Sequence, residues 1–187
     1  MKKVKIIVIL FLYFFTSHLL FAKEIFIDES SGKEYLFLGS VEENQKKWLD
    51  LKNNKIEWIE NSKLQQQSGQ LTPEEFFEKI IKSGLIFYAD GAEPFWNATI
   101  SENKLNISIS GEKEQELAIK MEMDKKPLDG VFLLMFQSKD HEVYGLIRKL
   151  WWDTPCDISV TDETSTFEVF INYRGKIVKG CARLDKK

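Results

Sequence analysis

The sequence predicts a mainly β fold: an antiparallel barrel or sandwich with one or two helices, one of them amphipathic and packed on the sheet, after an N-terminal signal helix. Three observations support this fold. Apolar residues alternate with polar ones along several segments, short polar turns separate these segments, and one segment has helical periodicity instead. The alternation is clearest in residues 105–109, 117–123 and 167–173. Consecutive strands joined by short turns pair antiparallel, so a barrel or a sandwich is expected.

Two further strands differ from this alternating pattern. Residues 131–136 are continuously apolar, which is typical of a central strand covered on both faces. Residues 143–150 can pair with that strand across a short polar turn. The chain turns again at Tyr173–Lys176 and then returns to Cys181, which predicts a final hairpin.

The amphipathic helix is predicted between residues 72 and 84. Thr72 can cap it, Pro73 fits the first helical position, and Glu75 completes a capping box. Gly84 is placed to end the helix. An apolar stripe along one side must bury against the sheet, and it consists of Phe76, Phe77, Ile80 and Ile81.

The chain is expected to have four parts. Residues 1–22 form a signal peptide, and residues 23–60 form a small N-terminal β-rich region. Residues 61–71 form a polar linker, and residues 72–187 form the domain of one helix and antiparallel strands. Within the N-terminal region, residues 42–51 fit either a strand or one or two helical turns.

The leader has the layout of a secretory signal peptide. Lysines precede an unbroken apolar run from Ile6 to Phe15, which polar residues interrupt before it is long enough to span a membrane. We expect cleavage after Ala22, which makes the mature protein periplasmic or secreted. The alternative is an uncleaved leader that anchors the protein in the membrane.

The charge of the mature protein argues against a nucleic-acid partner. Cleavage removes three of the 26 basic residues and none of the 29 acidic ones, which leaves a net charge of about −6. Binding to a polyphosphate requires a basic surface that releases counterions, and no stretch of the sequence supplies one.

Cys156 and Cys181 are the two cysteines, and in an oxidising compartment we expect them to form a disulfide. A loop of about 25 residues closed in this way contributes on the order of 3–4 kcal/mol of stability. The spacing differs from that of a Cys-x-x-Cys redox pair. His141, the one histidine beyond the leader, lies in a predicted turn, so we expect no metal site, cofactor or histidine-dependent nucleophile.

The segment around Glu93 has the densest cluster of unusual residues. Gly91 and Pro94 bend the chain at the entry to a strand, and Trp96 follows on that strand. One interpretation makes Glu93 a buried carboxylate with a raised pKa, which is how a general acid arises. The other makes Glu93 a hydrogen-bond acceptor that fixes the strand, with Trp96 in the core.

Trp151 and Trp152 are adjacent on a predicted strand, so they point in opposite directions. One ring can therefore enter the core while the other lies outside. An exposed tryptophan can stack on a sugar or on an apolar patch of a partner, although core packing is the commoner outcome.

Gly91–Trp96 resembles the G-x-E-P-F-W signature of a family of uncharacterised bacterial envelope proteins, many of them predicted lipoproteins. The C-terminal pattern of that family is matched in order by Cys156, Asp162, Phe167, Gly175, Gly180 and Cys181. Residues 158–161 depart from the family's Asp-Gly-Met-Ser, and the lipobox cysteine is missing. The resemblance implies a periplasmic or outer-membrane-associated β domain, and it implies no activity that transfers residue by residue.

The sequence therefore predicts a non-catalytic periplasmic or cell-envelope binding protein whose ligand is a glycan, a lipid or another envelope protein. Its expected binding surface is a rim with the loop 157–166 beside it, and the rim residues are Glu93, Trp96, Trp151 and Trp152. One alternative is a hydrolase of cell-wall glycan or peptide that uses Glu93 with Asp90 or Asp153. Another is an envelope metal or redox sensor.

Overall fold

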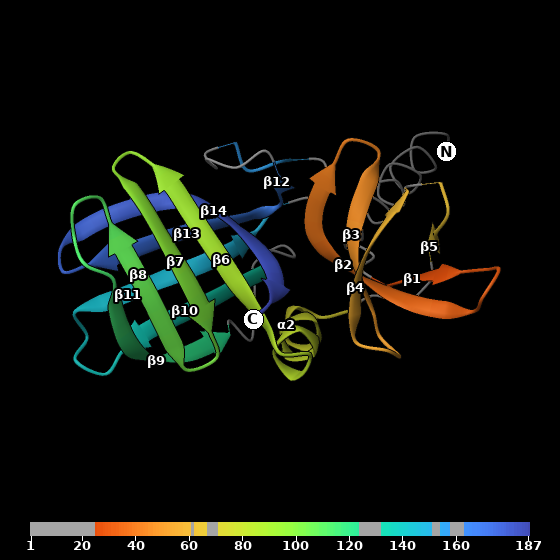
Figure 1. Ribbon diagram of the computed structural model, residues 1–187. Helices are drawn as coiled ribbons and strands as arrows, with labels where there is room; N and C mark the ends of the chain where they lie inside the picture. The colour runs from red at the N-terminus through yellow and green to blue at the C-terminus, as the bar shows by residue number, and fades with distance from the viewer. Residues whose placement is uncertain (1–24, 61, 67–70, 124–131, 151–153, 158–162) are drawn as a thin grey trace, which may run out of the picture.

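The computed structural model describes residues 25–60, 62–66, 71–123, 132–150, 154–157 and 163–187. Figure 1 shows a β-barrel on the left and a smaller sheet on the right, with helix α2 (Pro73–Lys82) below the junction between them. The predicted signal peptide, residues 1–22, lies outside the described residues. Within the described residues, no helix is both long and apolar enough to cross a membrane.

Eight of the described strands form a closed antiparallel barrel, which confirms the barrel alternative. Each strand pairs with the next barrel strand along the chain, and the last pairs with the first. The strands are β6 (Leu85–Ala92), β7 (Phe95–Ser101), β8 (Lys104–Ile109), β9 (Gln115–Met123), β10 (Phe132–Ser138), β11 (Val143–Lys149), β13 (Phe167–Tyr173) and β14 (Lys176–Lys186).

The barrel interior is filled by the inward members of the alternating pattern. Successive side chains of a strand point to opposite faces, so every second residue enters the core. Packed inside are, among others, Leu105, Ile107, Leu134, Phe136, Ile147, Val169 and Ile171. The interior is a packed core rather than an open cup, as eight strands allow.

Helix α2 lies against one end of the barrel. Its capping box is present as predicted: Thr72 accepts from the Glu75 backbone N–H, and the Glu75 carboxylate accepts from the backbone N–H of Thr72. Phe76 and Phe77 are fully buried, and the Phe76 ring meets the Phe132 ring edge to face, with 5.5 Å between the ring centroids. Four turns lie at the opposite end of the barrel: β6–β7, β8–β9, β10–β11 and β13–β14 (Figure 1).

The smaller sheet is built mainly from residues that precede the helix. Its strands are β1 (Ile25–Asp28), β2 (Lys33–Glu42), β3 (Gln45–Asp50), β4 (Lys55–Glu60), β5 (Gln65–Gln66) and, from later in the chain, β12 (Thr164–Ser165). Residues 45–50 form a strand, so the helical alternative for 42–51 is wrong. The expected linker 61–71 also contains a strand, because β5 pairs with β1.

The two sheets share a hydrophobic core, although no described strand of one pairs with a described strand of the other. Leu36, Leu38 and Leu49 of the smaller sheet belong to the same buried cluster as the barrel residues. β12 pairs with β2 shortly before the chain enters β13, and the Thr166 backbone N–H donates to the Gly39 carbonyl at 2.7 Å. One face of the sheet formed by residues 25–60 therefore packs as an extension of the barrel core, and Tyr35, Phe37 and Trp48 form a separate cluster.

Asp50 fixes the turn between β3 and β4. Its buried carboxylate accepts the backbone N–H groups of Lys52 and Asn53, each at 2.9 Å, and pairs with Lys33 at 3.3 Å. Burial raises the pKa of Asp50, but the hydrogen bonds from Asn53 and the other donors outweigh it, so the pKa lies below its ordinary value.

We expect Asp50→Ala to lower the free energy of unfolding at pH 7 by about 1–3 kcal/mol, because the backbone donors lose their acceptor. A carboxylate with a lowered pKa stabilises the fold above its unfolded pKa of about 3.9, and that stabilisation is lost as the pH falls through the folded pKa. The difference from wild type should therefore shrink below about pH 4. Urea unfolding at pH 7 and pH 3 measures both effects, with the exposed Glu34→Ala as control. A constant difference at both pH values would contradict the assignment.

Candidate functional site

The barrel closes where β14 pairs with β6, and Trp96 covers this seam from the inside. The Trp96 side chain is 3% exposed, and its indole N–H donates to the Lys179 carbonyl at 3.1 Å. A Cβ on Gly91 would lie 2.3 Å from the indole nitrogen, and a Cβ on Gly180 would lie 1.9 Å from the Asp90 carbonyl oxygen. Both positions therefore require glycine. Trp96, placed in the rim by the sequence, is a core residue of the seam.

The predicted disulfide is present and reinforces the same seam. Cys156 and Cys181 are joined, with their Cα atoms 5.7 Å apart, and the described residues contain no free cysteine. The Cys156 backbone N–H donates to the Ser165 carbonyl at 2.7 Å, and the Ser165 hydroxyl donates to the Ala182 carbonyl. The bond thus ties the segment before β13 to strand β14. Several residues of the family-like pattern, Gly91, Trp96, Gly180 and both cysteines, are explained by closure of the barrel.

The other residues of the predicted rim do not form a described surface with Trp96. Glu93 is exposed in the turn between β6 and β7, so its interpretation as a buried carboxylate is wrong. Trp151 and Trp152 lie outside the described residues, as does Asp153. Of the predicted loop 157–166, residues 158–162 also lie outside the described part.

Asp90, the other acid considered as a partner of Glu93, forms an ion pair with Arg183. It is buried on β6, and its carboxylate pairs with the Arg183 guanidinium at 2.9 Å. Glu93 lines none of the three depressions described below. The described geometry thus gives no support to a pair of catalytic carboxylates in a cleft.

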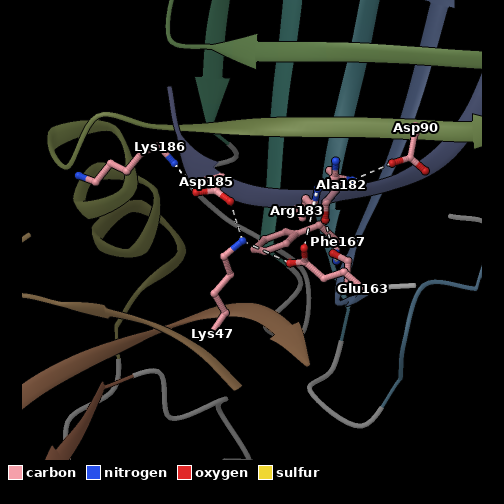
Figure 2. Close-up of polar contacts among 9 residues, drawn as sticks. Lys47, Asp90, Glu163, Phe167, Ala182, Arg183, Asp185 and Lys186 are labelled. Atoms are coloured by element: carbon pink, nitrogen blue, oxygen red, sulfur yellow. Dashed lines mark hydrogen bonds and ion pairs between the residues drawn. The ribbon is translucent and has the colours of Figure 1, made fainter. Parts of the chain in front are cut away.

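Arg183 belongs to a network of ion pairs at the junction of the two sheets, drawn in Figure 2. At its centre is Lys47 of β3, which is 3% exposed. The Lys47 ammonium lies 2.9 Å from an Asp185 carboxylate oxygen and 3.4 Å from one of Glu163. Arg183 also approaches Glu163, at 3.8 Å. Lys47 belongs to the smaller sheet and Asp185 to the barrel, so the network connects the two sheets.

His141 lies at the tip of the β10–β11 turn, with a φ of 62°. It is exposed, as the sequence predicts for a turn residue. Among the described residues, no group of three His, Cys, Asp or Glu is placed to hold a metal ion.

The most distinctive surface is a depression on the outside of the barrel, which we call the outer groove. It has a volume of about 540 Å³ and lies over β9, β10, β11, β13 and β14. Its apolar side chains are Met135, Tyr144, Leu146, Phe170 and Ile177. Among the described residues, the exposed large hydrophobic side chains are Ile177 (72%), Phe95 (64%), Tyr144 (51%) and Met135 (44%), so three of the four line this groove.

Strand register aligns these side chains in two rows. Met135, Leu146 and Phe170 are direct cross-strand neighbours, and they form an apolar row across three strands. In the next row Tyr144 lies opposite Asn172, and Asn172 lies opposite Ile177. The Asn172 amide donates to the Tyr144 hydroxyl at 2.9 Å, which holds that ring in place. The apolar part of the groove is thus built on paired strands, and the β10–β11 turn borders one end of it.

Ion pairs border this apolar surface on both sides. On β9, Lys120 pairs with Glu122 at 2.7 Å, and this hydrogen bond raises the pKa of Lys120. On the other side, Glu168 pairs with Lys179 at 2.7 Å and also with Arg148. Most charges near the groove are thus neutralised by neighbours, as in the polar rim of a binding surface.

Two other depressions are less suited to a ligand. One, of about 630 Å³, lies on the smaller sheet beside Tyr35 and Trp58. Four of its lining residues are acidic. The other, of about 760 Å³, lies between α2 and β9, where Met121 and Met123 are partly buried.

One signal in the sequence pointed to the outer groove. The continuous apolar run at 131–136 predicts a strand covered on both faces. In the structure the described residues cover the inner face of β10 alone, because Met135 on the outer face is 44% exposed. The groove was otherwise hidden, because its residues come from separate segments that the register brings together. A scan against protein-family models found no match to this chain, and neither did a search of curated proteins or a search of solved structures.

Proposed function

We propose that this chain is a non-catalytic binding protein of the cell envelope that holds its partner in the outer groove. The observation that carries the proposal is the gathering of Met135, Tyr144 and Ile177, all exposed, in one depression on the barrel wall. Exposed apolar side chains that cluster rather than scatter are typical of interaction sites. The lysine-tipped leader and the disulfide support an envelope location, periplasmic or secreted.

The state of the candidate chemical groups also favours binding over catalysis. The Trp96 indole is used inside the barrel, the Asp90 carboxylate is paired with Arg183, and both sulfurs are joined in the disulfide. Among the described residues, no specific observation favours the hydrolase or the metal or redox sensor. The proposed partner classes are the same as those predicted from the sequence: a lipid, a glycan or an envelope protein. The acidic net charge disfavours a nucleic acid.

Photo-crosslinking tests the proposal. A photoreactive phenylalanine analogue at Tyr144, inside the groove, is expected to label an envelope component severalfold more than the same analogue at Phe95, which is more exposed (64% against 51%) but lies outside the groove. Leu146→Glu, which places a charge in the apolar row, should abolish the labelling at position 144. Mass spectrometry of the adduct identifies the partner. Equal labelling at positions 144 and 95 would contradict the proposal.

A further inference from the structure

We infer that the outer groove binds a single-chain amphiphile with one anionic head group, that is, a fatty acid. This inference rests on the proposed function and gives the chemical class of its ligand. The apolar row of Met135, Leu146 and Phe170 would hold the chain. Flexible methionine and flat aromatic side chains adapt to an acyl chain without a shaped pocket.

The anionic head group follows from the charges at one end of the groove. Lys139 lines the groove at the β10–β11 turn, next to His141. Within the described part of the chain, the ammonium of Lys139 has no carboxylate partner, whereas Lys120, the other lysine of the lining, is paired with Glu122. An unpaired cation beside an apolar surface is complementary to a carboxylate at the end of an apolar chain.

The acids closest to Lys139 in the sequence, Asp140 and Glu142, have other partners. The Asp140 carboxylate accepts from the Ser138 hydroxyl and from the Glu142 backbone N–H, and the hydrogen bond from Ser138 lowers the pKa of Asp140. The Glu142 carboxylate pairs with Arg174 at 3.2 Å. Neither acid lines the groove, so Lys139 is available to a ligand there.

The size of the groove favours a small amphiphile over a protein. A volume of about 540 Å³ lies within the roughly 300–1,000 Å³ of small-molecule sites. A stable protein interface needs about 800 Å² from each partner. Here the apolar surface is bounded by the Lys120–Glu122 pair on one side and by Glu168 and its partners on the other. An acyl chain fits between these borders without breaking an ion pair.

Isothermal titration calorimetry on the purified protein tests the inference with decanoate and 1-decanol, which share a chain length and differ in the charge of the head group. We expect decanoate to bind about tenfold more tightly, which is the effect of one charge-assisted hydrogen bond. Lys139→Gln should remove this preference by weakening decanoate and leaving 1-decanol unchanged. Lys113→Gln, an exposed turn lysine outside the groove, is the matched control and should change neither. Met135→Glu should weaken both ligands.

The outcomes separate this inference from the proposed function. If decanoate and 1-decanol bind equally, or if Lys139→Gln binds decanoate as wild type does, the anionic head group is refuted while the groove remains a binding site. If neither ligand binds but position 144 still crosslinks to a protein, the fatty acid is refuted and the binding function stands. If neither ligand binds and no crosslink forms, both are refuted.

Discussion

Replacement of Gly180 with alanine is expected to prevent the barrel from closing. The added Cβ would lie 1.9 Å from the backbone carbonyl oxygen of Asp90 and 2.7 Å from the Trp96 ring. A clash with backbone on the neighbouring strand cannot be relieved by rotating a side chain, and strands β14 and β6 would have to separate. We expect a loss of more than about 4 kcal/mol, enough to unfold a domain of ordinary stability. Near-ultraviolet circular dichroism and urea unfolding measure the effect.

Two controls isolate the cause. Gly175→Ala, in the turn that precedes β14, meets no atom within 4 Å but places alanine at a φ of 83°, so it should cost about 1–2 kcal/mol. Trp96→Ala combined with Gly180→Ala should not restore the fold, because the Asp90 carbonyl remains in the way. A Gly180→Ala protein with a wild-type unfolding midpoint would show that the seam is formed differently.

The second large effect is expected from Lys47→Met, which removes the central cation of the junction. Asp185 then loses its ammonium partner, whereas Glu163 keeps Arg183 nearby. Breaking a fully buried pair costs about 3–5 kcal/mol. Because Asp185 is partly exposed, water screens part of that cost, and we expect about 2–3 kcal/mol. The smaller sheet should also become more accessible to protease before the barrel unfolds.

A double-mutant cycle checks this assignment. Asp185→Asn in the Lys47→Met background removes the unpaired charge and should recover part of the lost stability. Lys55→Met, on the exposed end of the neighbouring strand, should change the free energy of unfolding by no more than about 0.5 kcal/mol. Additive effects of Lys47→Met and Asp185→Asn would mean that the two side chains are not coupled.

Local patterns were sufficient to predict the class of the fold. The alternation in 105–109 and 167–173 gives strands because half-buried strands have a period of two residues, and the capping box at Thr72 marks the start of α2 as observed. The disulfide also followed from the expectation of an oxidising compartment, in which cysteine pairs are usually joined. Residues 42–51 were ambiguous, because a short segment with mixed periodicity fits both a strand and a helical turn.

The candidate site depended on information that local patterns do not contain. Trp96 was an ambiguous residue until the register placed Gly91 and Gly180 beside it, and those positions are far apart in the sequence. Lys47 meets Glu163 and Asp185 across 116 and 138 residues. The outer groove has the same origin, because closure of the barrel decides which outward side chains become neighbours.

Strand β14 imposes an order on the maturation of the molecule. It supplies the partner of β6, the second sulfur of the disulfide and the carboxylate that holds Lys47, and its Lys186 ammonium also reaches the Ser83 carbonyl at the end of α2. None of these contacts can form before residues 176–186 have emerged during synthesis or translocation. Without β14, strands β6 and β13 lack a partner, and unpaired strand edges are prone to aggregation. We therefore expect a chain truncated before residue 176 to aggregate more readily than the full chain, which light scattering during refolding measures.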